Sequence, residues 1–160
     1  MNTLSVIIIA GDVADEILPT LKGAKEFADE IIVVYNGSSG DGTTLKAVKP
    51  YATKIYQTNG HDFSKWRNQG AQLATSDWLF YLDSDERVTP ALAEEIKKVI
   101  NTSEFSAYEI SRFEIFLGKH LSHWGDPWVL RLIKKDKLDK WVGKLHEQPK
   151  ISGPIGKLKN

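Results

Sequence analysis

A run of five apolar residues that ends in a group of acidic ones constrains the fold more than any other part of this sequence. The run covers residues 78–82, and Asp83-Ser84-Asp85-Glu86 follows it directly. A short run with almost no polar residue is typical of a strand buried on both faces, as in a parallel sheet. Open α/β sheets bind their ligands just outside the carboxyl ends of the strands. The junction therefore predicts a parallel α/β sheet with acidic groups in its binding crevice.

The spacing of two of these acids indicates a metal–phosphate site. Asp83 and Asp85 are two residues apart, so in an extended chain their carboxylates point the same way. Like charges so close repel each other unless a cation lies between them. A hard divalent cation, bridging the pair to a diphosphate, would supply that charge. A bare pair of this kind is more often a solvated acidic turn, but its position after a buried strand favours the metal site.

Strands and helices alternate along the first hundred residues. Apolar and β-branched runs predict strands at residues 5–10, 30–35 and 53–57. Helical spacing predicts helices over residues 17–28, 43–51 and 63–73, and a fourth from Pro90 to near Asn101 with Thr89 as its N-cap. This order is that of βαβ units in a parallel sheet. After residue 104, residues 108–113 and 128–133 are expected to be strands without long helices between them. The predicted fold class is α/β: a Rossmann-like, mostly parallel sheet flanked by helices, with a mixed, irregular C-terminal part.

Length and composition limit the class of protein. At 160 residues the chain is expected to form one domain, and the absence of cysteine excludes disulfides and thiolate metal sites. Residues 6–10 are apolar but no basic residues precede them, so no signal peptide is expected, and no run reaches the roughly 20 apolar residues of a membrane span. A cytoplasmic protein is the expectation.

The net charge of zero hides an asymmetry. Residues 131–160 carry nine basic and three acidic side chains, a net charge of +6, and residues 1–130 carry a net charge of −6. Such a basic segment faces phosphates or the anionic inner surface of the cytoplasmic membrane, or is simply a solvated face. No nucleic-acid-binding motif is present, so nucleic acid is not an expected partner.

Three further groups of residues are candidates for a site. Residues 36–42 form a Gly-rich loop at the same predicted sheet edge as Asp83, or else an ordinary turn. Arg67, next to Asn68 on the third predicted helix, reaches a phosphate or base, or else is a surface arginine. His146 and Glu147 are a metal ligand beside a base, or else an ordinary loop pair.

Ten short segments carry a resemblance to a known family. In order they are LSVIIIA (4–10), ADEIIVV (28–34), GSS (37–39), DGT (41–43), RN (67–68), ATSDW (74–78), DSDERV (83–88), FLG (116–118), RL (131–132) and HE (146–147). Together they resemble family 2 glycosyltransferases, nearest to the bacterial lipopolysaccharide-core glucosyltransferase type. The resemblance spans essentially the whole chain.

The resemblance implies a fold, a reaction and roles. The fold is GT-A, and the reaction moves a sugar, with inversion, from a nucleotide diphosphate sugar (a UDP-hexose) to a glycan or lipid-linked acceptor in bacterial cell-surface polysaccharide synthesis. Mg²⁺ or Mn²⁺ sits on the diphosphate, held by Asp83 and Asp85, with Ser84 between them. The nucleoside is cradled by Ala10, Gly11, Asn36 and Gly37, and Arg67 and Asn68 lie near the nucleotide. Glu147 is the first candidate for the catalytic base and Asp126 the second, with Arg131 as a source of positive charge. Residues 1–103 then bind the donor and residues 104–160 face the acceptor.

Two departures from the family pattern leave other functions open. The family usually has an aspartate that contacts the base at the end of the second strand, where Tyr35 or Asn36 stands here, and an Asn-Glu pair after the first strand, where Gly11-Asp12-Val13 stands. Relatives also usually continue into further helices. A catalytically inactive nucleotide-sugar-binding module is therefore one alternative. A nucleotidyltransferase of similar fold is another, although no Arg- or Lys-containing Gly-rich loop follows the first strand. A phosphoacceptor receiver domain fits less well. Its acidic residues follow the first and third strands, whereas the acidic pair here follows the fourth.

Overall fold

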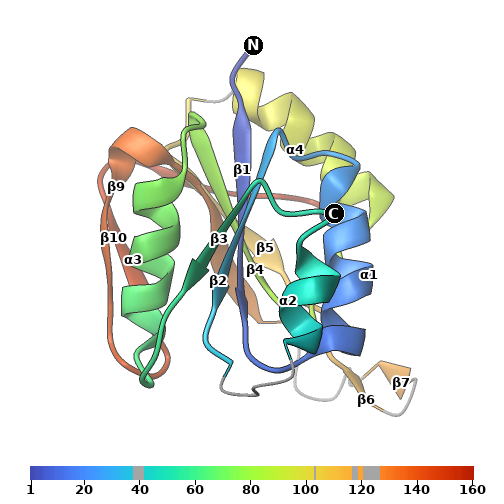
Figure 1. The fold of residues 1–160 in the computed structure, drawn as a ribbon. Coiled ribbons are helices and arrows are strands. Elements are labelled where there is room, and N and C mark those ends of the chain that lie inside the picture. Colours follow the sequence, from blue (N-terminus) through green and yellow to red (C-terminus); the bar gives the residue numbers. More distant parts are fainter. Residues whose placement is uncertain (38–41, 103, 117–118, 121–126) are drawn as a thin grey trace.

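A seven-stranded sheet organises the protein (Figure 1). The structure is a computed structural model and describes residues 1–37, 42–102, 104–116, 119–120 and 127–160. Its strands are β1 (Leu4–Ala10), β2 (Glu30–Tyr35), β3 (Lys54–Gln57), β4 (Trp78–Asp83), β5 (Ala107–Ser111), β6 (Ile115–Phe116), β7 (Lys119–His120), β8 (Trp128–Lys134), β9 (Leu138–Val142), β10 (Gln148–Ile151) and β11 (Ile155–Lys157). Its helices are α1 (Ala14–Lys25), α2 (Thr43–Val48), α3 (Phe63–Leu73), α4 (Pro90–Thr102) and the 3₁₀ turn η2 (Lys135–Lys137).

The strand order confirms the predicted mostly parallel sheet. The order is β11-β5-β8-β4-β1-β2-β3, and β9–β10 and β6–β7 form two small separate ribbons. At the centre, Ile7 of β1 lies opposite Ile32 of β2 and Tyr81 of β4, both in parallel register. Strand β8 runs antiparallel to both of its neighbours, β4 and β5. The mixed character predicted after residue 104 therefore comes from β8 and the two ribbons.

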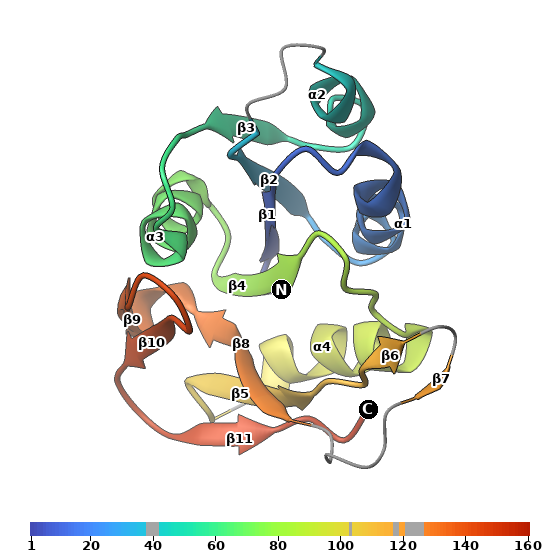
Figure 2. The same ribbon diagram turned by 90° about the horizontal axis from the view of Figure 1, so that it is seen from below.

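Elements cover both faces of the sheet (Figure 2), and alternate residues of the central strands pack on the two layers. Leu4, Val6 and Ile8 of β1 join a core with α1, α2 and α4 on one face of the sheet. Ile7 and Ile9 belong to the cores on the opposite face, which α3 and the β9–β10 hairpin cover. Both faces of β1, β2 and β4 are thus buried, which is why these strands are apolar without alternation. No helix in the described ranges is long and apolar enough to cross a membrane.

The ends of the elements differ from the sequence prediction in a few places. Thr89 caps α4 as predicted, since its Oγ1 accepts a hydrogen bond from the Leu92 backbone N–H at 3.1 Å. Helix α2 stops at Val48 rather than at residue 51, because Pro50 has no N–H with which to continue the helical ladder. Helix α1 ends at Lys25, so Ala28 lies beyond it. Strand β5 ends at Ser111, two residues earlier than predicted.

A buried glutamate ties the amino end of β2 to its neighbours. Glu30, 6% exposed, accepts hydrogen bonds from Lys54 Nζ at 2.7 Å, Ser5 Oγ at 2.5 Å and the Thr75 backbone N–H at 2.9 Å. Burial alone would raise the pKa of Glu30, but the hydrogen bonds and the charge of Lys54 hold it below its ordinary value of 4.5. The ionised carboxylate is therefore part of the folded state.

Replacing Glu30 by glutamine should lower the free energy of unfolding at pH 7 by about 2–3 kcal/mol, because Lys54 loses its charge partner and three hydrogen bonds weaken. The stabilisation is present above the ordinary pKa and is lost as the pH falls through the lower pKa of the folded state. Urea unfolding at pH 7 and at pH 3 measures both effects. Glu94→Gln is the control, since its ion pair with Lys97 is exposed and should contribute under about 0.5 kcal/mol. An equal loss for Glu30→Gln at the two pH values would contradict the assignment.

Candidate active site

The candidate site lies where the carboxyl ends of β1, β2 and β4 meet. Strands β2 and β3 lie on one side of β1, and β4 lies on the other. The strand order therefore changes direction between β1 and β4, which makes this boundary a topological switch point. Ligands of open α/β sheets bind outside the strands at such a switch point. The connection between β9 and β10 reaches the same lower edge of the sheet in Figure 1.

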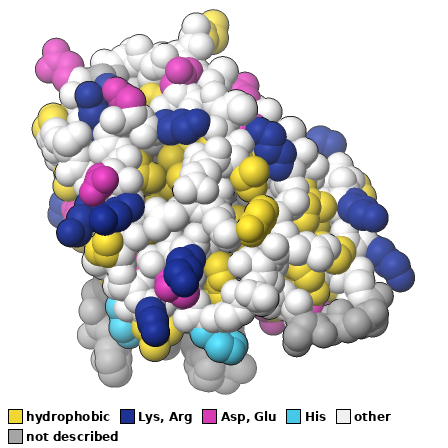
Figure 3. Space-filling model, turned by 60° about the vertical axis from the view of Figure 1, so that its left-hand side comes forward, with side chains coloured by type: hydrophobic (Ala, Val, Ile, Leu, Met, Phe, Trp, Pro, Cys, Tyr) yellow, Lys and Arg dark blue, Asp and Glu magenta, His cyan; other side chains and the backbone are white. Residues whose placement is uncertain are grey.

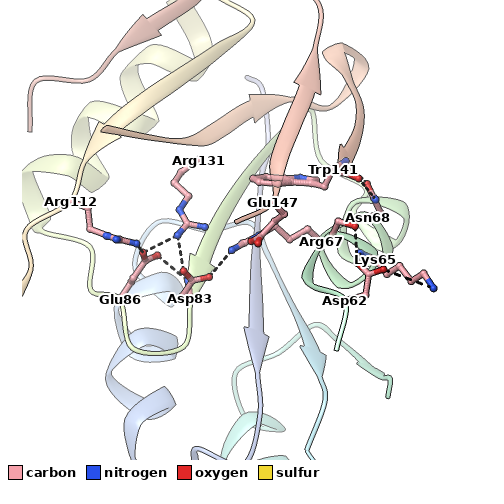
Figure 4. A network of polar contacts seen from close by, with 11 residues as sticks. Asp62, Lys65, Arg67, Asn68, Asp83, Glu86, Arg112, Arg131, Trp141 and Glu147 are labelled. Atoms are coloured by element: carbon pink, nitrogen blue, oxygen red, sulfur yellow. Dashed lines mark hydrogen bonds and ion pairs between the residues drawn. The ribbon is translucent and has the colours of Figure 1, made fainter. Parts of the chain in front are cut away.

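Asp83, the last residue of β4, is held between two buried arginines (Figure 4). Arg67 Nη2 donates to its Oδ1 at 2.8 Å, and Arg131 Nη2 donates to its Oδ2 at 2.7 Å. The two arginine side chains are 4% and 9% exposed. Burial acts to raise the pKa of Asp83, but the charges of Arg131 and Arg67 hold it below its ordinary value. The carboxylate is ionised, and both of its oxygens are engaged.

Glu86 completes the turn that follows β4. Its Oε2 accepts a hydrogen bond from the Asp83 backbone N–H at 2.9 Å, and its Oε1 accepts one from Arg131 Nη2 at 3.0 Å. Arg112 Nη1 lies 3.6 Å from the same Oε1. The Glu86 N–H in turn donates to the Asp83 carbonyl oxygen at 3.1 Å. No role was predicted for Glu86, although it belongs to the same acidic group as Asp83 and Asp85.

This turn changes the geometry assumed for the acidic pair. The chain is extended only as far as Asp83, and residues 84–85 form the turn, so the argument from an extended chain was wrong here. The Ser84 carbonyl oxygen accepts a hydrogen bond from Thr20 Oγ1 at 2.7 Å, which fixes the turn to α1. Asp85 is exposed and makes no hydrogen bond or ion pair with any described residue. Its carboxylate is therefore open to a cation, and each Asp83 oxygen, which accepts one arginine hydrogen bond, keeps a second lone pair.

Arg67 also binds the second predicted acid of the site. Its Nε donates to Glu147 Oε1 at 2.6 Å, and the Glu147 side chain is 11% exposed. Asn68, the next residue of α3, makes two hydrogen bonds with the backbone of Trp141: its Oδ1 accepts from the N–H at 2.8 Å and its Nδ2 donates to the carbonyl at 2.9 Å. The structure thus brings Arg67, Asp83 and Glu147 together, whereas Asn68 faces β9. No periodicity or motif in the sequence indicated Trp141.

The glycines and Asn36 predicted to cradle a nucleoside lie at the neighbouring strand ends. Ala10 ends β1 and Gly11 follows it, and Asn36 follows β2. The Asn36 Nδ2 donates to the Gly60 carbonyl oxygen at 3.1 Å, which ties this end of β2 to the segment before α3. These residues lie at the same edge of the sheet as Asp83. A cavity of about 610 Å³ lies at the opposite, amino-terminal edge, lined by residues such as Thr75 and Lys135, away from the acids described above.

Tyr35 occupies the end of β2 and contacts a carboxylate from the β1 loop. Its hydroxyl donates to Asp12 Oδ1 at 2.5 Å, and the tyrosine is buried while the aspartate is exposed. A Cβ on Gly37 would lie 2.1 Å from both of these oxygens, so any larger residue there would displace the pair. A carboxylate therefore stands near the end of β2 after all, supplied by Asp12.

Two predicted residues are not among the groups described above. Asp126 lies outside the described residues. His146 is exposed in the β9–β10 connection and has a positive φ of 55°, beside Glu147. Within the described part of the chain, no three His, Cys, Asp or Glu side chains converge as a metal site. A cation here would thus depend on one or two carboxylates together with oxygens of a ligand, which is the usual mode of Mg²⁺ with substrate phosphates.

The sequence matches the glycosyl transferase family 2 profile over residues 5–151. It is 27% identical over 148 residues to the SPbeta prophage-derived glycosyltransferase SunS of Bacillus subtilis, covering 92% of this chain and 35% of that protein. It is 31% identical over 119 residues to a TPR repeat-containing protein of Synechococcus elongatus, covering 74% of this chain and 29% of the relative. The chain therefore spans about a third of the length of these relatives.

Solved structures share the fold. The TarS protein of Staphylococcus aureus superposes with a TM-score of 0.59 at 17% identity, over 73% of this chain and 37% of that one. Glucosyl-3-phosphoglycerate synthase from Mycobacterium tuberculosis, solved with Mn²⁺ and UDP, gives a TM-score of 0.55 at 16% identity, over 68% and 43% of the two chains. These likenesses confirm the predicted GT-A fold.

Proposed function

The chain belongs to glycosyl transferase family 2, and on that premise we propose that it transfers a hexosyl unit from a UDP-sugar, with inversion, to a hydroxyl of a glycan or lipid-linked acceptor. The observation that carries the proposal is the placement of Asp83 and Glu147 on one buried arginine at the switch point of the sheet. Residues 1–103 contribute the donor side, and residues 104–160 the acceptor side. The lipopolysaccharide-core pathway is the setting we propose for the acceptor, from the sequence resemblance alone.

A divalent cation, Mg²⁺ or Mn²⁺, fits the residues at the end of β4. Asp85 is exposed and unengaged among the described residues, and Asp83 is 34% exposed beside it. Two carboxylates suffice when phosphate oxygens of the ligand fill the other positions. A bound cation stabilises the negative charge that develops on the leaving diphosphate. The glucosyl-3-phosphoglycerate synthase of similar fold, solved with Mn²⁺ and UDP, supports this choice of cofactor.

Glu147 is the residue proposed to receive the proton of the attacking hydroxyl. The acceptor oxygen forms a bond to the anomeric carbon while the bond from that carbon to the diphosphate oxygen breaks, and UDP leaves with the electron pair. The hydroxyl proton passes to the Glu147 carboxylate, which must lie within hydrogen-bond reach. Arg131, next to Asp83, adds positive charge on the diphosphate side.

Replacing Asp85 by asparagine should abolish the dependence of UDP affinity on Mn²⁺ while the fold stays intact, because the side chain is exposed and the substitution removes only its charge. Calorimetry of UDP binding with Mn²⁺ and with EDTA, in the wild type and in Asp85→Asn, measures the effect. Asp15→Asn, an exposed aspartate on α1, is the matched control and should behave as the wild type. Identical affinities with Mn²⁺ and EDTA in the wild type would rule out the metal role.

The function itself is tested by nucleotide selection and by turnover. Calorimetry with UDP, GDP, CDP and dTDP should give the tightest binding for UDP, and incubation with UDP-hexoses should release UDP. Binding of UDP without turnover toward water or any glycan acceptor would favour the alternative of an inactive binding module. A preference for nucleoside triphosphates would favour a nucleotidyltransferase.

We also propose that the β9–β10 hairpin contacts an anionic surface, although the basic segment is less concentrated than its sequence implies. Arg131 is buried in the site, and Lys157 lies 3.5 Å from Glu109. Figure 3 shows Lys and Arg side chains spread over the α3 and β9–β10 side rather than gathered in one patch. Lys140 and Lys150 are exposed and lie opposite each other across the hairpin, and Lys144 in its connection is exposed as well.

Vesicles should distinguish this contact from a solvated face. Each lysine near an anionic membrane contributes about 1 kcal/mol, and salt screens the attraction. Co-sedimentation with anionic vesicles should therefore exceed that with neutral ones at low salt, and a double Lys140→Gln, Lys150→Gln variant should reduce the difference. Binding that ignores lipid charge and salt, or the absence of binding, would leave the hairpin as a solvated face.

A further inference from the structure

Arg67 links the two acids of the candidate site. Its Nε donates to Glu147 at 2.6 Å and its Nη2 donates to Asp83 at 2.8 Å. In Figure 4 the guanidinium lies between the two carboxylates, one from the end of β4 and one from the β9–β10 connection. One rigid group thus fixes the distance between the acid proposed for the donor side and the acid proposed as base.

The guanidinium of Arg67 is closed to a ligand. The residue is 3% exposed, and its remaining nitrogen, Nη1, is buried without a hydrogen-bond partner among the described residues. Two aromatic rings flank it, with Cζ 4.9 Å from the Trp141 ring centre and 5.8 Å from that of Tyr81. A nucleotide phosphate or base therefore finds no accessible donor on this side chain, in contrast to the role that the sequence resemblance implied.

The surroundings of Arg67 hold it in a single orientation. Asn68 bonds to both the N–H and the carbonyl of Trp141, so α3 and β9 are tied together beside the arginine. The Tyr81 and Trp141 rings also pack on each other, with their centres 4.7 Å apart at an interplanar angle of 67°. A planar guanidinium fixed in this way presents its N–H groups in a set direction.

The contact with Arg67 leaves one oxygen of Glu147 available. Oε1 accepts the Arg67 hydrogen bond, whereas Oε2 makes no hydrogen bond or ion pair with any described group. A general base must present a free oxygen toward the hydroxyl that it deprotonates. The arginine thus decides which oxygen of Glu147 stays free.

We propose that Arg67 is a positioning residue, which orients the Glu147 carboxylate so that Oε2 takes the proton of the attacking hydroxyl, and that it makes no contact with the nucleotide. This inference rests on the proposed function. It separates the roles of the two arginines that bind Asp83: Arg131 acts on the donor side, and Arg67 acts through Glu147.

Arg67→Gln and its matched control Arg131→Gln distinguish these roles, because each removes one arginine from Asp83 and only the first also releases Glu147. The kcat for UDP release from a UDP-hexose, with water as acceptor, and the Kd of UDP by calorimetry are measured in both. Arg67→Gln should lower kcat by at least about 10²-fold, the smaller effect typical of losing a general base, with the Kd of UDP unchanged. Arg131→Gln should weaken UDP binding.

Double variants with Glu147→Gln exclude a merely structural role. Arg67→Gln should cause no further loss of kcat once Glu147 is replaced. Arg131→Gln should lower kcat further in the same background, which shows that the assay can still detect a smaller kcat. Circular dichroism checks that each variant is folded, and Arg67→Lys replaces Arg67→Gln if the latter is not.

Weaker UDP binding in Arg67→Gln with kcat unchanged would overturn the inference, as would additive losses in the Arg67→Gln, Glu147→Gln double variant. Both results leave the proposed function standing. Absence of any UDP release by the wild-type chain would instead overturn the proposed function, and this inference with it.

Discussion

Replacing Glu147 by glutamine should lower kcat by about 10²- to 10⁴-fold, the range expected when a general base is removed, while donor affinity changes little. The amide keeps an oxygen that can accept the Arg67 hydrogen bond, so the local structure should survive. What it loses is the ability to take a proton in the transition state. Steady-state release of UDP from a UDP-hexose gives kcat, and calorimetry with UDP gives the affinity.

The second candidate for the base supplies the comparison. Asp126 lies outside the described residues, and the family resemblance is what makes it a candidate. Asp126→Asn should keep near-normal turnover if Glu147 is the base. The reverse pattern, with normal turnover in Glu147→Gln and a large loss in Asp126→Asn, would transfer the role to Asp126 and remove the reason for the Arg67–Glu147 contact in catalysis.

The sheet could be predicted because its signal is local. Strands β1, β2 and β4 are apolar on both faces, and the structure places each within a residue of the prediction. The order of helices and strands then fixed the parallel arrangement, and with it the edge at which Asp83 emerges. Short strands such as β10 and β11, with polar and apolar residues in no clear period, gave no comparable signal.

The contacts within the site could not be predicted in the same way. Arg67 and Glu147 lie 80 residues apart, and nothing local to either residue indicates the other. Taken alone, Arg67 was interpreted as a surface arginine more readily than as a ligand, yet it is among the most buried charged residues of the described chain. Its burial follows from the packing of the β9–β10 hairpin on α3, a tertiary contact that the local sequence does not encode. The turn after Asp83 could not be predicted either, because it depends on a hydrogen bond from the Asp83 backbone N–H to the Glu86 carboxylate.

Replacing Asp83 by asparagine should lower the free energy of unfolding more than any other single substitution at the site. The two arginine side chains that it pairs are 4% and 9% exposed, and a buried charge that loses its partner typically costs 3–5 kcal/mol. Asp83 itself is 34% exposed, so water offsets part of that cost and the lower end, about 3 kcal/mol, is expected. The asparagine amide also places an N–H₂ group where one arginine now finds a carboxylate oxygen.

Urea unfolding of Asp83→Asn and Asp85→Asn, side by side, tests this reasoning with one chemical change at two positions. Asp85 is exposed and engages no described group, so its variant should unfold within about 0.5 kcal/mol of the wild type, as is usual for surface substitutions. Both variants should lose metal-dependent UDP affinity, because each removes a proposed ligand, but only Asp83→Asn should lose stability. Equal stability of the two would mean that Glu86 and Glu147 already neutralise Arg131 and Arg67, and that Asp83 is held in place chiefly for its ligand.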